Sequence, residues 1–532
     1  MKKLFRHIAL GLILVGIMAS SCVKDEYSLQ NMKTPEWDPN FAAPLINSRL
    51  TFWDILNDFD TTDIVIEDET QFLYLVYNST AFSQTAEDLI SIPDQNASAS
   101  HNFSTGTIAV ADSFVTTLVY TYNFNFPSSQ VIDSIYLKSG SLNLSINSNF
   151  NLPAKIELKL PGTKQGQPFK ETVYMNTPTG NQSIGLNNTK LIFNHSGGNN
   201  KLEMTFRVVL YGNGNPNQSP YNINISNSFY NVKFKAIYGY LGQLNFAMNE
   251  DTVKVKLYDN HFNGIINWQD PRYYLTATNY LGVPVQLTID LLETKSTRPP
   301  FNTYQIVGAG IPNPWNILYP SFSQMGQGVK TLMYLDKNNS NIDAAYDIAP
   351  QQMNALISAV TNSSGPTQNF VFDTSRFTLD AKVELPLHGT AHNFTIVDTM
   401  DVNIGEDFKN SEYIDWILFK IYAENGFPID AEIQIYFLDS GYNIVDSLLA
   451  PPQQLIHAAT PGPAPDYIVT GKYKKMITTT IYNDRIAEYH RIKYAVVKAK
   501  MHTFNSGTQI VKIYSYYDLH VKIGAQVQMN FN

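Results

Sequence analysis

The chain contains a single cysteine, Cys22, in 532 residues. One thiol cannot form a disulfide within the chain, and it cannot build the multi-cysteine clusters of structural zinc sites. Charged residues are also scarce, at 16% of the sequence, and the 37 basic residues are outnumbered by 46 acidic ones. Because proteins bind nucleic acid through clustered lysine and arginine, this composition argues against a nucleic-acid partner.

Long apolar runs and catalytic signatures are missing as well. The apolar run over residues 8–18 is too short to cross the hydrocarbon core of a membrane. The sequence has no nucleophile elbow, no zinc-protease helix motif and no glycine-rich phosphate loop. His388 and His392 could share a metal ion on a helix, but Gly389 and the flanking alternation favour a strand. We therefore expect no metal site and no enzymatic activity.

The first 22 residues form a recognisable unit. Basic residues begin the chain, an apolar run follows, and small residues end it, which is the layout of a secretory leader. The small residues Ala19, Ser20 and Ser21 lead directly into Cys22, and this stretch resembles the lipobox of bacterial lipoproteins. The resemblance implies a signal peptide over residues 1–21. It also implies a covalent lipid on Cys22, with no other cofactor.

The residues after the cysteine suggest where the anchored protein is displayed. Lys24, Asp25 and Glu26 follow Cys22 closely. They resemble the export signal by which some two-membraned bacteria move lipoproteins to the outer face of the outer membrane. We therefore expect an outer-membrane lipoprotein that faces the extracellular side on a flexible tether over residues 22–40. Loss of the leader would leave 34 basic and 46 acidic residues, a formal charge of −12.

Alternation of apolar and polar residues dominates the remaining chain. Runs over residues 142–146, 156–160, 253–257 and 433–437 place an apolar residue at every second position. Successive side chains of a strand point to opposite faces, so each run has one dry and one wet face. This pattern is typical of packed antiparallel sheets. We predict a mainly β fold of multiple antiparallel β-sandwich units with a few short helices.

One segment has helical spacing instead. In residues 350–360 the apolar residues Met353, Leu356, Ile357 and Val360 recur at intervals of three and one, after Pro350. Proline suits the first turn of a helix. The spacing therefore predicts a short helix near residues 350–360.

A degenerate repeat suggests how the units are organised. Three segments, each about 20 residues long, read as strand, asparagine, short turn, proline and strand, and their prolines are Pro153, Pro284 and Pro428. Proline can open a strand because its missing N–H is not yet needed by the ladder. We expect three sandwich regions, over residues 41–235, 236–380 and 381–532, that are copies of one unit or only share a common motif.

Function is less determined than fold. We expect a partner of this surface protein to contact the long connections, such as residues 293–330. Trp315 lies in this connection and is a candidate for stacking on a sugar ring. The first expectation is a non-catalytic accessory or scaffold subunit that contacts an outer-membrane barrel or another lipoprotein. A glycan-binding lipoprotein for nutrient capture and an extracellular hydrolase are the alternatives.

Overall fold

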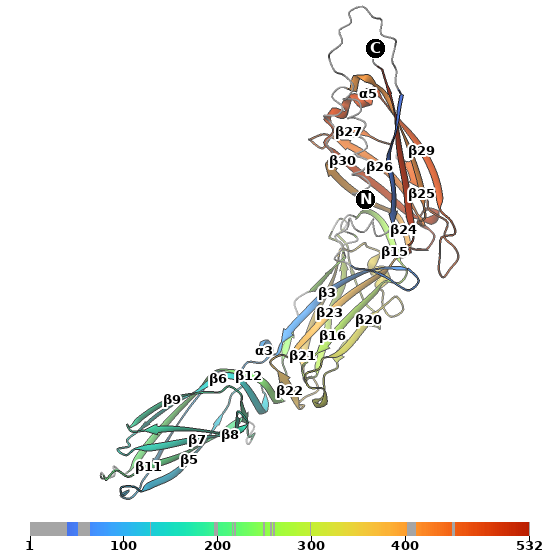
Figure 1. Cartoon of the computed structure of the whole chain (residues 1–532). Coiled ribbons are helices and arrows are strands. Elements are labelled where there is room, and N and C mark those ends of the chain that lie inside the picture. The colour runs from blue at the N-terminus through green and yellow to red at the C-terminus, as the bar shows by residue number, and fades with distance from the viewer. Residues whose placement is uncertain are drawn as a thin grey trace, which may run out of the picture.

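A computed structural model describes residues 40–51 and 64–530. Short gaps within this range are residues 128, 196–199, 215, 217–219, 248–250, 256–257, 259–260, 298, 300, 402–410 and 450–452. Every strand pairing in the described part is antiparallel, and the strands form five sheets. The prediction of a mainly antiparallel β fold is confirmed. The sheets make up three sandwich units in a row, so the molecule is elongated (Figure 1).

The first unit lies at the lower left in Figure 1 and consists of one ten-stranded sheet folded over on itself. One layer contains β9 (Thr179–Gly185), β6 (Val131–Ser148), β12 (Tyr221–Tyr240) and β4 (Gln95–Phe103), with β22 (Asn369–Phe372) along the far half of β12. The other layer contains β8 (Gln167–Met175), β7 (Ala154–Lys164), β11 (Lys201–Tyr211) and β5 (Ser113–Asn123). Strand β10 (Thr189–Ile192) pairs with both β6 and β7 and so joins the two layers.

The second unit lies in the middle of the molecule and has two sheets. The six-stranded sheet contains β13 (Asn245–Ala247), β14 (Asp251–Lys254), β21 (Gln352–Thr361), β17 (Val285–Lys295), β18 (Thr303–Gln305) and β19 (Trp315–Ile317). The five-stranded sheet contains β2 (Ile64–Glu67), β3 (Leu73–Thr85), β23 (Arg376–Pro386), β16 (Arg272–Asn279) and β20 (Val329–Leu335). Buried side chains of the first and second units form one continuous core.

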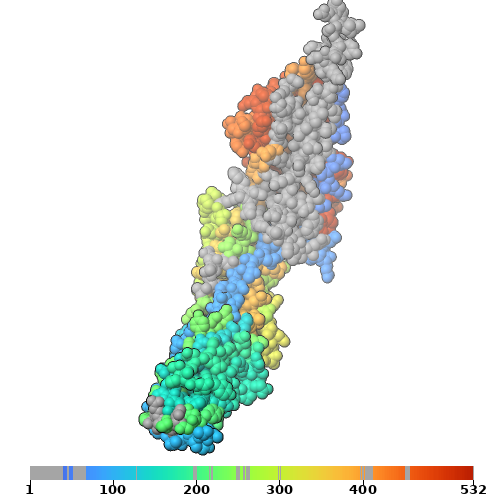
Figure 2. All heavy atoms as spheres, turned by 60° about the vertical axis from the view of Figure 1, so that its left-hand side comes forward, coloured from blue at the N-terminus to red at the C-terminus, as the bar shows by residue number. Residues whose placement is uncertain are grey.

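The third unit lies at the opposite end from the first and has a separate core. Its four-stranded sheet contains β1 (Asn40–Thr51), β32 (Asp518–Met529), β25 (Ile414–Asn425) and β29 (Tyr473–Tyr482). Its seven-stranded sheet contains β15 (His261–Trp268), β24 (His388–Asp401), β30 (Tyr494–Thr503), β26 (Ile429–Leu438), β27 (Ile444–Ser447), β28 (Gln453–Ile456) and β31 (Val511–Lys512). Figure 2 shows the same elongated form from another side.

The chain passes back and forth between the units. It begins in the third unit with β1, enters the second with β2 and β3, and builds most of the first from β4 to β12. It returns through the second unit with β13 and β14, adds β15 to the third, and comes back to the second for β16 to β21. It then adds β22 to the first unit and β23 to the second, and completes the third with β24 to β32. The three continuous regions expected over 41–235, 236–380 and 381–532 therefore differ from the sheets. Which strands belong to which unit depends on pairing between segments far apart in the chain, and local sequence does not encode this pairing.

The prediction of a helix near residues 350–360 is wrong, because residues Gln352–Thr361 form strand β21. Its buried residues include Met353, Ala355, Ile357 and Ala359, which alternate, whereas Leu356 is exposed. Two of these four buried residues are alanines. The spacing of the larger apolar residues alone therefore resembled the period of a helix, although the buried residues follow the period of a strand. The described helices are short: α3 (Ala86–Leu89), α4 (Ile342–Tyr346), α5 (Asn483–Ile486), α6 (Phe504–Gly507), η3 (Phe322–Gln324), η4 (Ser411–Tyr413) and η5 (Ala487–Arg491).

The three proline-containing turns have the same place in their units. Each one leads from a strand in one layer to a strand in the facing layer: β6 to β7, β16 to β17 and β25 to β26. In the second and third units, the buried Asn279 and Asn425 accept a hydrogen bond from the backbone N–H two residues later, at 2.8 and 2.9 Å. Asn425 also donates to the carbonyl of Ile429, just beyond Pro428, at 3.0 Å. The repeated motif thus marks the crossing between layers.

Candidate functional site

The candidate site is the outer surface of the layer formed by β9, β6, β12 and β4 in the first unit. Leu142, Leu144 and Ile146 of β6 point into the core and are almost completely buried. Strand alternation therefore turns Asn143 and Ser145 outward. Asparagine and serine are poor strand formers, so the apolar inner face stabilises these strands.

Residues of the same kind face outward on all four strands and line up across them. One cross-strand row contains Ser183, Asn143, Ser228 and Asn96, and the next contains Asn181, Ser145, Ser226 and Ser98. A third row contains Thr179, Asn147, Asn224 and Ser100. We call these three rows the asparagine–serine face.

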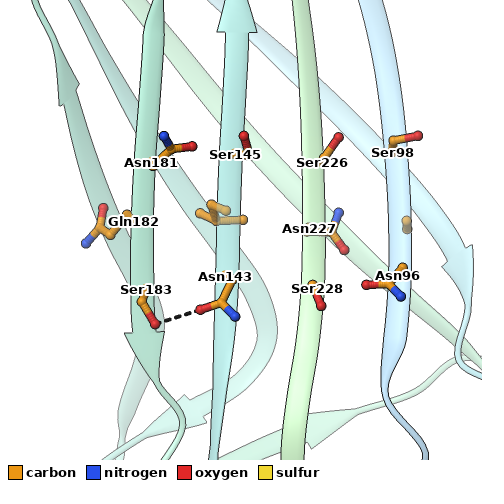
Figure 3. Close-up of a pocket in the computed structure, with 12 residues that line it drawn as sticks. Asn96, Ser98, Asn143, Ser145, Asn181, Gln182, Ser183, Ser226, Asn227 and Ser228 are labelled. Carbon is orange, nitrogen blue, oxygen red and sulfur yellow. Dashed lines mark hydrogen bonds between the residues drawn. The ribbon is translucent and has the colours of Figure 1, made fainter.

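The asparagine–serine face is hollowed and uncharged. The hollow has a volume of about 710 Å³, and none of the 12 residues that line it is ionisable (Figure 3). Ser183 Oγ donates a hydrogen bond to Asn143 Oδ1 at 2.6 Å, which fixes one pair across β9 and β6. The side chains of Asn96 and Asn181 have no hydrogen-bond partner among the described residues, so their amides are free to bind a ligand.

A tyrosine ends the asparagine–serine face on one side. Tyr230 follows Ser228 by two residues on β12, lies opposite Ser141 of β6, and is 57% exposed. Gly185 of β9 lies on the other side of Ser141 and leaves space where a side chain would stand. The row beside the amides therefore combines a flat aromatic ring with open space.

The opposite outer surface of the same unit is charged, which gives an internal comparison. Glu157 of β7 lies 2.7 Å from Lys155 Nζ, 3.2 Å from Lys170 Nζ and 3.4 Å from an Arg207 nitrogen. Hydrogen bonds, first from Lys155 and then from Lys170, lower the pKa of the Glu157 carboxyl to about 2. Ionic side chains are thus accommodated on one outer layer of the first unit and are absent from the hollow on the other.

Trp315, the predicted sugar contact, is not exposed. The expectation rested on its place in a long connection, but Trp315 begins the short strand β19, pairs with Leu287 of β17 and is 4% exposed. Pairing with β17 turns the indole into the core, so the expected ligand contact at Trp315 is wrong. Trp268 is buried too, and its Nε1 donates to Tyr258 Oη at 2.6 Å.

The other residues singled out from the sequence are not brought together. Cys22, Lys24, Asp25 and Glu26 lie outside the described residues. His388 and His392 lie on strand β24, as the alternation predicted. His388 Nδ1 is 2.9 Å from Asp270 Oδ2, whereas His392 Nδ1 is 2.9 Å from the Ser506 carbonyl oxygen.

Sequence reasoning missed the asparagine–serine face. The alternation over residues 142–146 identifies the buried side of the strand but does not distinguish a binding surface from an ordinary solvent-facing one. The available signal was that short uncharged side chains, rather than lysine or glutamate, fill those positions in the segments 96–100, 143–147, 181–183 and 224–228. Only strand pairing shows that these four segments share one surface.

Comparisons with known proteins give no family. No protein-family model matches the chain, and a search of curated proteins finds no match. Among solved structures, a candidate secreted protein from Parabacteroides distasonis ATCC 8503 has 10% identity and a TM-score of 0.29, over 55% of this chain and 89% of that one. The cowpea mosaic virus top component has 8% identity and a TM-score of 0.12, over 53% of this chain and 93% of that one.

A third match is the infectious bursal disease virus Gt strain structure, with 9% identity and a TM-score of 0.13 over 88% of this chain and 83% of that one. Within the described ranges, no helix has the length and hydropathy needed to cross a bilayer. The same part of the chain contains no cluster of three or more histidine, cysteine, aspartate or glutamate side chains suited to a metal ion.

Proposed function

We propose that this chain is a non-catalytic, lipid-anchored surface protein that binds a neutral polysaccharide on the asparagine–serine face. The observation that carries the proposal is the uncharged hollow whose outward side chains are short amides and hydroxyls. Amides offer both donors and acceptors to sugar hydroxyls, and short side chains lose little conformational entropy when a ligand orders them.

The shape of the face favours an extended ligand over a small one. Its rows run across four strands, so a chain of sugar units can meet amides from β9, β6, β12 and β4 in succession. Tyr230 at one end supplies an aromatic ring for the apolar face of a pyranose. No ionic side chain lines the hollow, so a neutral sugar that binds there would cover no charged group of the protein.

The position of the first unit supports display. Strand β1 begins at Asn40, only 18 residues after the proposed lipid-bearing Cys22, and it belongs to the third unit. The first unit lies at the opposite end of the molecule (Figure 1). A lipid anchor on Cys22 would thus leave the asparagine–serine face far from the point of attachment, where a polymer outside the cell could reach it.

The proposal is tested by affinity electrophoresis of the purified full chain in gels that contain neutral or acidic polysaccharides. We expect retardation by at least one neutral polymer. The double variant Ser145→Glu, Ser226→Glu places two carboxylates in the hollow and should weaken binding at least about tenfold. A matched control is Thr117→Glu on β5, which puts a carboxylate on the other outer layer opposite Arg207.

Two results would refute the glycan proposal. One is the absence of retardation in every neutral polysaccharide tried. The other is unchanged binding by the double variant while its circular dichroism spectrum remains that of the wild type.

A second candidate function is the accessory subunit of an outer-membrane assembly. The observation that favours it is an exposed apolar loop over residues 318–328, in which Leu318, Tyr319, Phe322 and Met325 are each more than two-fifths exposed. The loop packs on the first unit, since the Phe322 ring lies 5.0 Å from that of Phe370. An outer-membrane barrel or another lipoprotein is the expected partner.

Co-purification from gently solubilised outer membranes tests this second function. A barrel or lipoprotein should accompany the wild type in fixed ratio and be lost when Leu318 and Phe322 are both replaced by serine. Recovery of the chain without a partner would refute the accessory role and leave glycan binding as the proposed function.

A further inference from the structure

We propose a second glycan-binding site, on the outer surface of the four-stranded sheet of the third unit. It rests on a row of side chains that crosses all four strands: Tyr482 on β29, Trp416 on β25, Gln528 on β32 and Asn40 on β1. The inference goes beyond the proposed function because it concerns a different unit and needs none of the residues of the asparagine–serine face.

The row lies on the solvent side of the sheet. Ile417, Phe419 and Ile421 of β25 are buried in the core of the third unit, so alternation turns Trp416 outward. Trp416 is partly exposed, and Tyr482 is 59% exposed. Directly opposed residues of neighbouring strands have Cβ atoms about 5 Å apart, which places the two aromatic side chains next to each other.

A β-bulge helps to aim the tryptophan. The pairing between β25 and β32 shifts register between Ile414 and Trp416, with Asp415 as the extra residue. Bulges are common beside functional sites, where they redirect a side chain relative to the regular pleat. The bulge therefore distinguishes this end of β25 from the regularly paired positions that follow it.

Amide side chains beside the rings are held in place by one another. Asn40 Nδ2 donates to Gln528 Oε1 at 2.9 Å, and Gln526 Nε2 donates to Asn40 Oδ1 at 2.8 Å. This short network holds the three amides in a fixed orientation beside the rings. Preorganised donors and acceptors next to a flat aromatic surface suit a ligand with hydroxyls at its edge and C–H bonds on its face.

The class of ligand follows from the exposed aromatic rings, the oriented amides and the lack of charge in these two rows. The aromatic row and its neighbouring row, Thr480, Leu418, Gln526 and Ala42, contain no ionisable group other than the tyrosine phenol. A neutral oligosaccharide supplies stacking faces and hydroxyls without burying a charge. A chain long enough to reach both this site and the asparagine–serine face would gain affinity through effective concentration.

The test titrates the full chain with a panel of neutral hexasaccharides, namely maltohexaose, cellohexaose, xylohexaose and mannohexaose, and follows tryptophan fluorescence and heat. We expect at least one to change the fluorescence, and Trp416→Phe to abolish most of that change because, of the three tryptophans in the part of the chain that the structure describes, Trp268 and Trp315 are buried. Trp416→Ala and Tyr482→Ala should each weaken this binding at least about tenfold.

Control variants separate this site from the first one. Tyr473→Ala removes an exposed tyrosine at the other end of β29 and should leave affinity unchanged. The double variant Ser145→Glu, Ser226→Glu should leave the Trp416-dependent signal intact, so failure of the asparagine–serine face and failure of this site are distinguishable.

Two outcomes would overturn the second site. One is that no hexasaccharide of the panel gives a signal that depends on Trp416, with both alanine variants folded by circular dichroism. The other is that the full chain binds phosphatidylcholine vesicles, loses this binding in Trp416→Ala and binds no hexasaccharide, which would make the aromatic row a seat for the lipid surface.

Discussion

Glu157 illustrates, at the scale of a residue, how position on a strand decides chemistry. It lies on β7 with Lys155 two residues before it and with Lys170 and Arg207 on the two neighbouring strands. Its side chain is largely buried among three cations. One carboxylate thus links cations from three neighbouring strands.

The lowered pKa of Glu157 predicts a pH-dependent contribution to stability. Because the folded pKa, about 2, is below the ordinary value of 4.5, the ionised form stabilises the folded state above pH 4.5. This contribution decreases as pH falls from 4.5 toward 2. The unfolding midpoint of Glu157→Gln should therefore be clearly lower than that of the wild type at pH 7, and the difference should shrink steadily between pH 4.5 and 3.

Circular dichroism melts from pH 3 to pH 7 measure this difference. Glu203→Gln on the neighbouring strand β11 is the control, since Glu203 is exposed and has no ion pair among the described residues. A difference for Glu157→Gln that stays constant down to pH 3 would contradict the assignment.

At the scale of an element, the end of β7 shows how the two layers of the first unit are joined through β10. Its first half pairs with β11, and its last residues, from Gly162 on, pair with β10, which also pairs with β6. Gly162 has φ +135°, and a Cβ there would lie 1.9 Å from the carbonyl oxygen of Lys190. The close approach of β7 to β10 thus depends on a residue without a side chain.

Gly162→Ala should destabilise the first unit by at least ~2 kcal/mol, because both the backbone conformation and the contact with β10 must change. Urea unfolding of the purified variant measures this effect. Gly106→Ala is the matched control, since a Cβ there meets no atom within 4 Å and its φ is not positive. Equal midpoints for the two variants would show that β10 can move aside without cost.

At the scale of the whole molecule, the third unit is built from distant parts of the chain. Strand β1 pairs with β32 along its length, and β15 pairs with β24. A fragment of residues 381–532, although it is the region expected from sequence to fold as one sandwich, lacks both strands. Its two sheets would each expose an unpaired edge.

We therefore expect the 381–532 fragment to unfold without a sharp transition and to self-associate. Size-exclusion chromatography and thermal melts of the fragment, compared with the full chain, test this. Addition of a peptide of residues 40–51 should restore part of the cooperativity by completing the four-stranded sheet. A monomeric fragment that melts sharply on its own would show that β1 and β15 are dispensable.

The sequence by itself determined the class of the fold and the crossing points between layers. Alternation identified strands such as β6, β7 and β26, since a period of two is a local property of the backbone. The turns before Pro153, Pro284 and Pro428 were also identified locally, because asparagine and proline act on their nearest neighbours. The lipid anchor on Cys22 and the export signal at Lys24, Asp25 and Glu26 remain predictions from sequence.

Only the tertiary structure decided which strands are neighbours, and with them the candidate sites. The helix expected near residues 350–360 became β21 because pairing with β17 outweighed an apparent helical period. Trp315 turned inward for the same reason. The asparagine–serine face and the row around Trp416 join residues up to several hundred positions apart, and cross-strand register, which creates those surfaces, depends on packing rather than on local sequence.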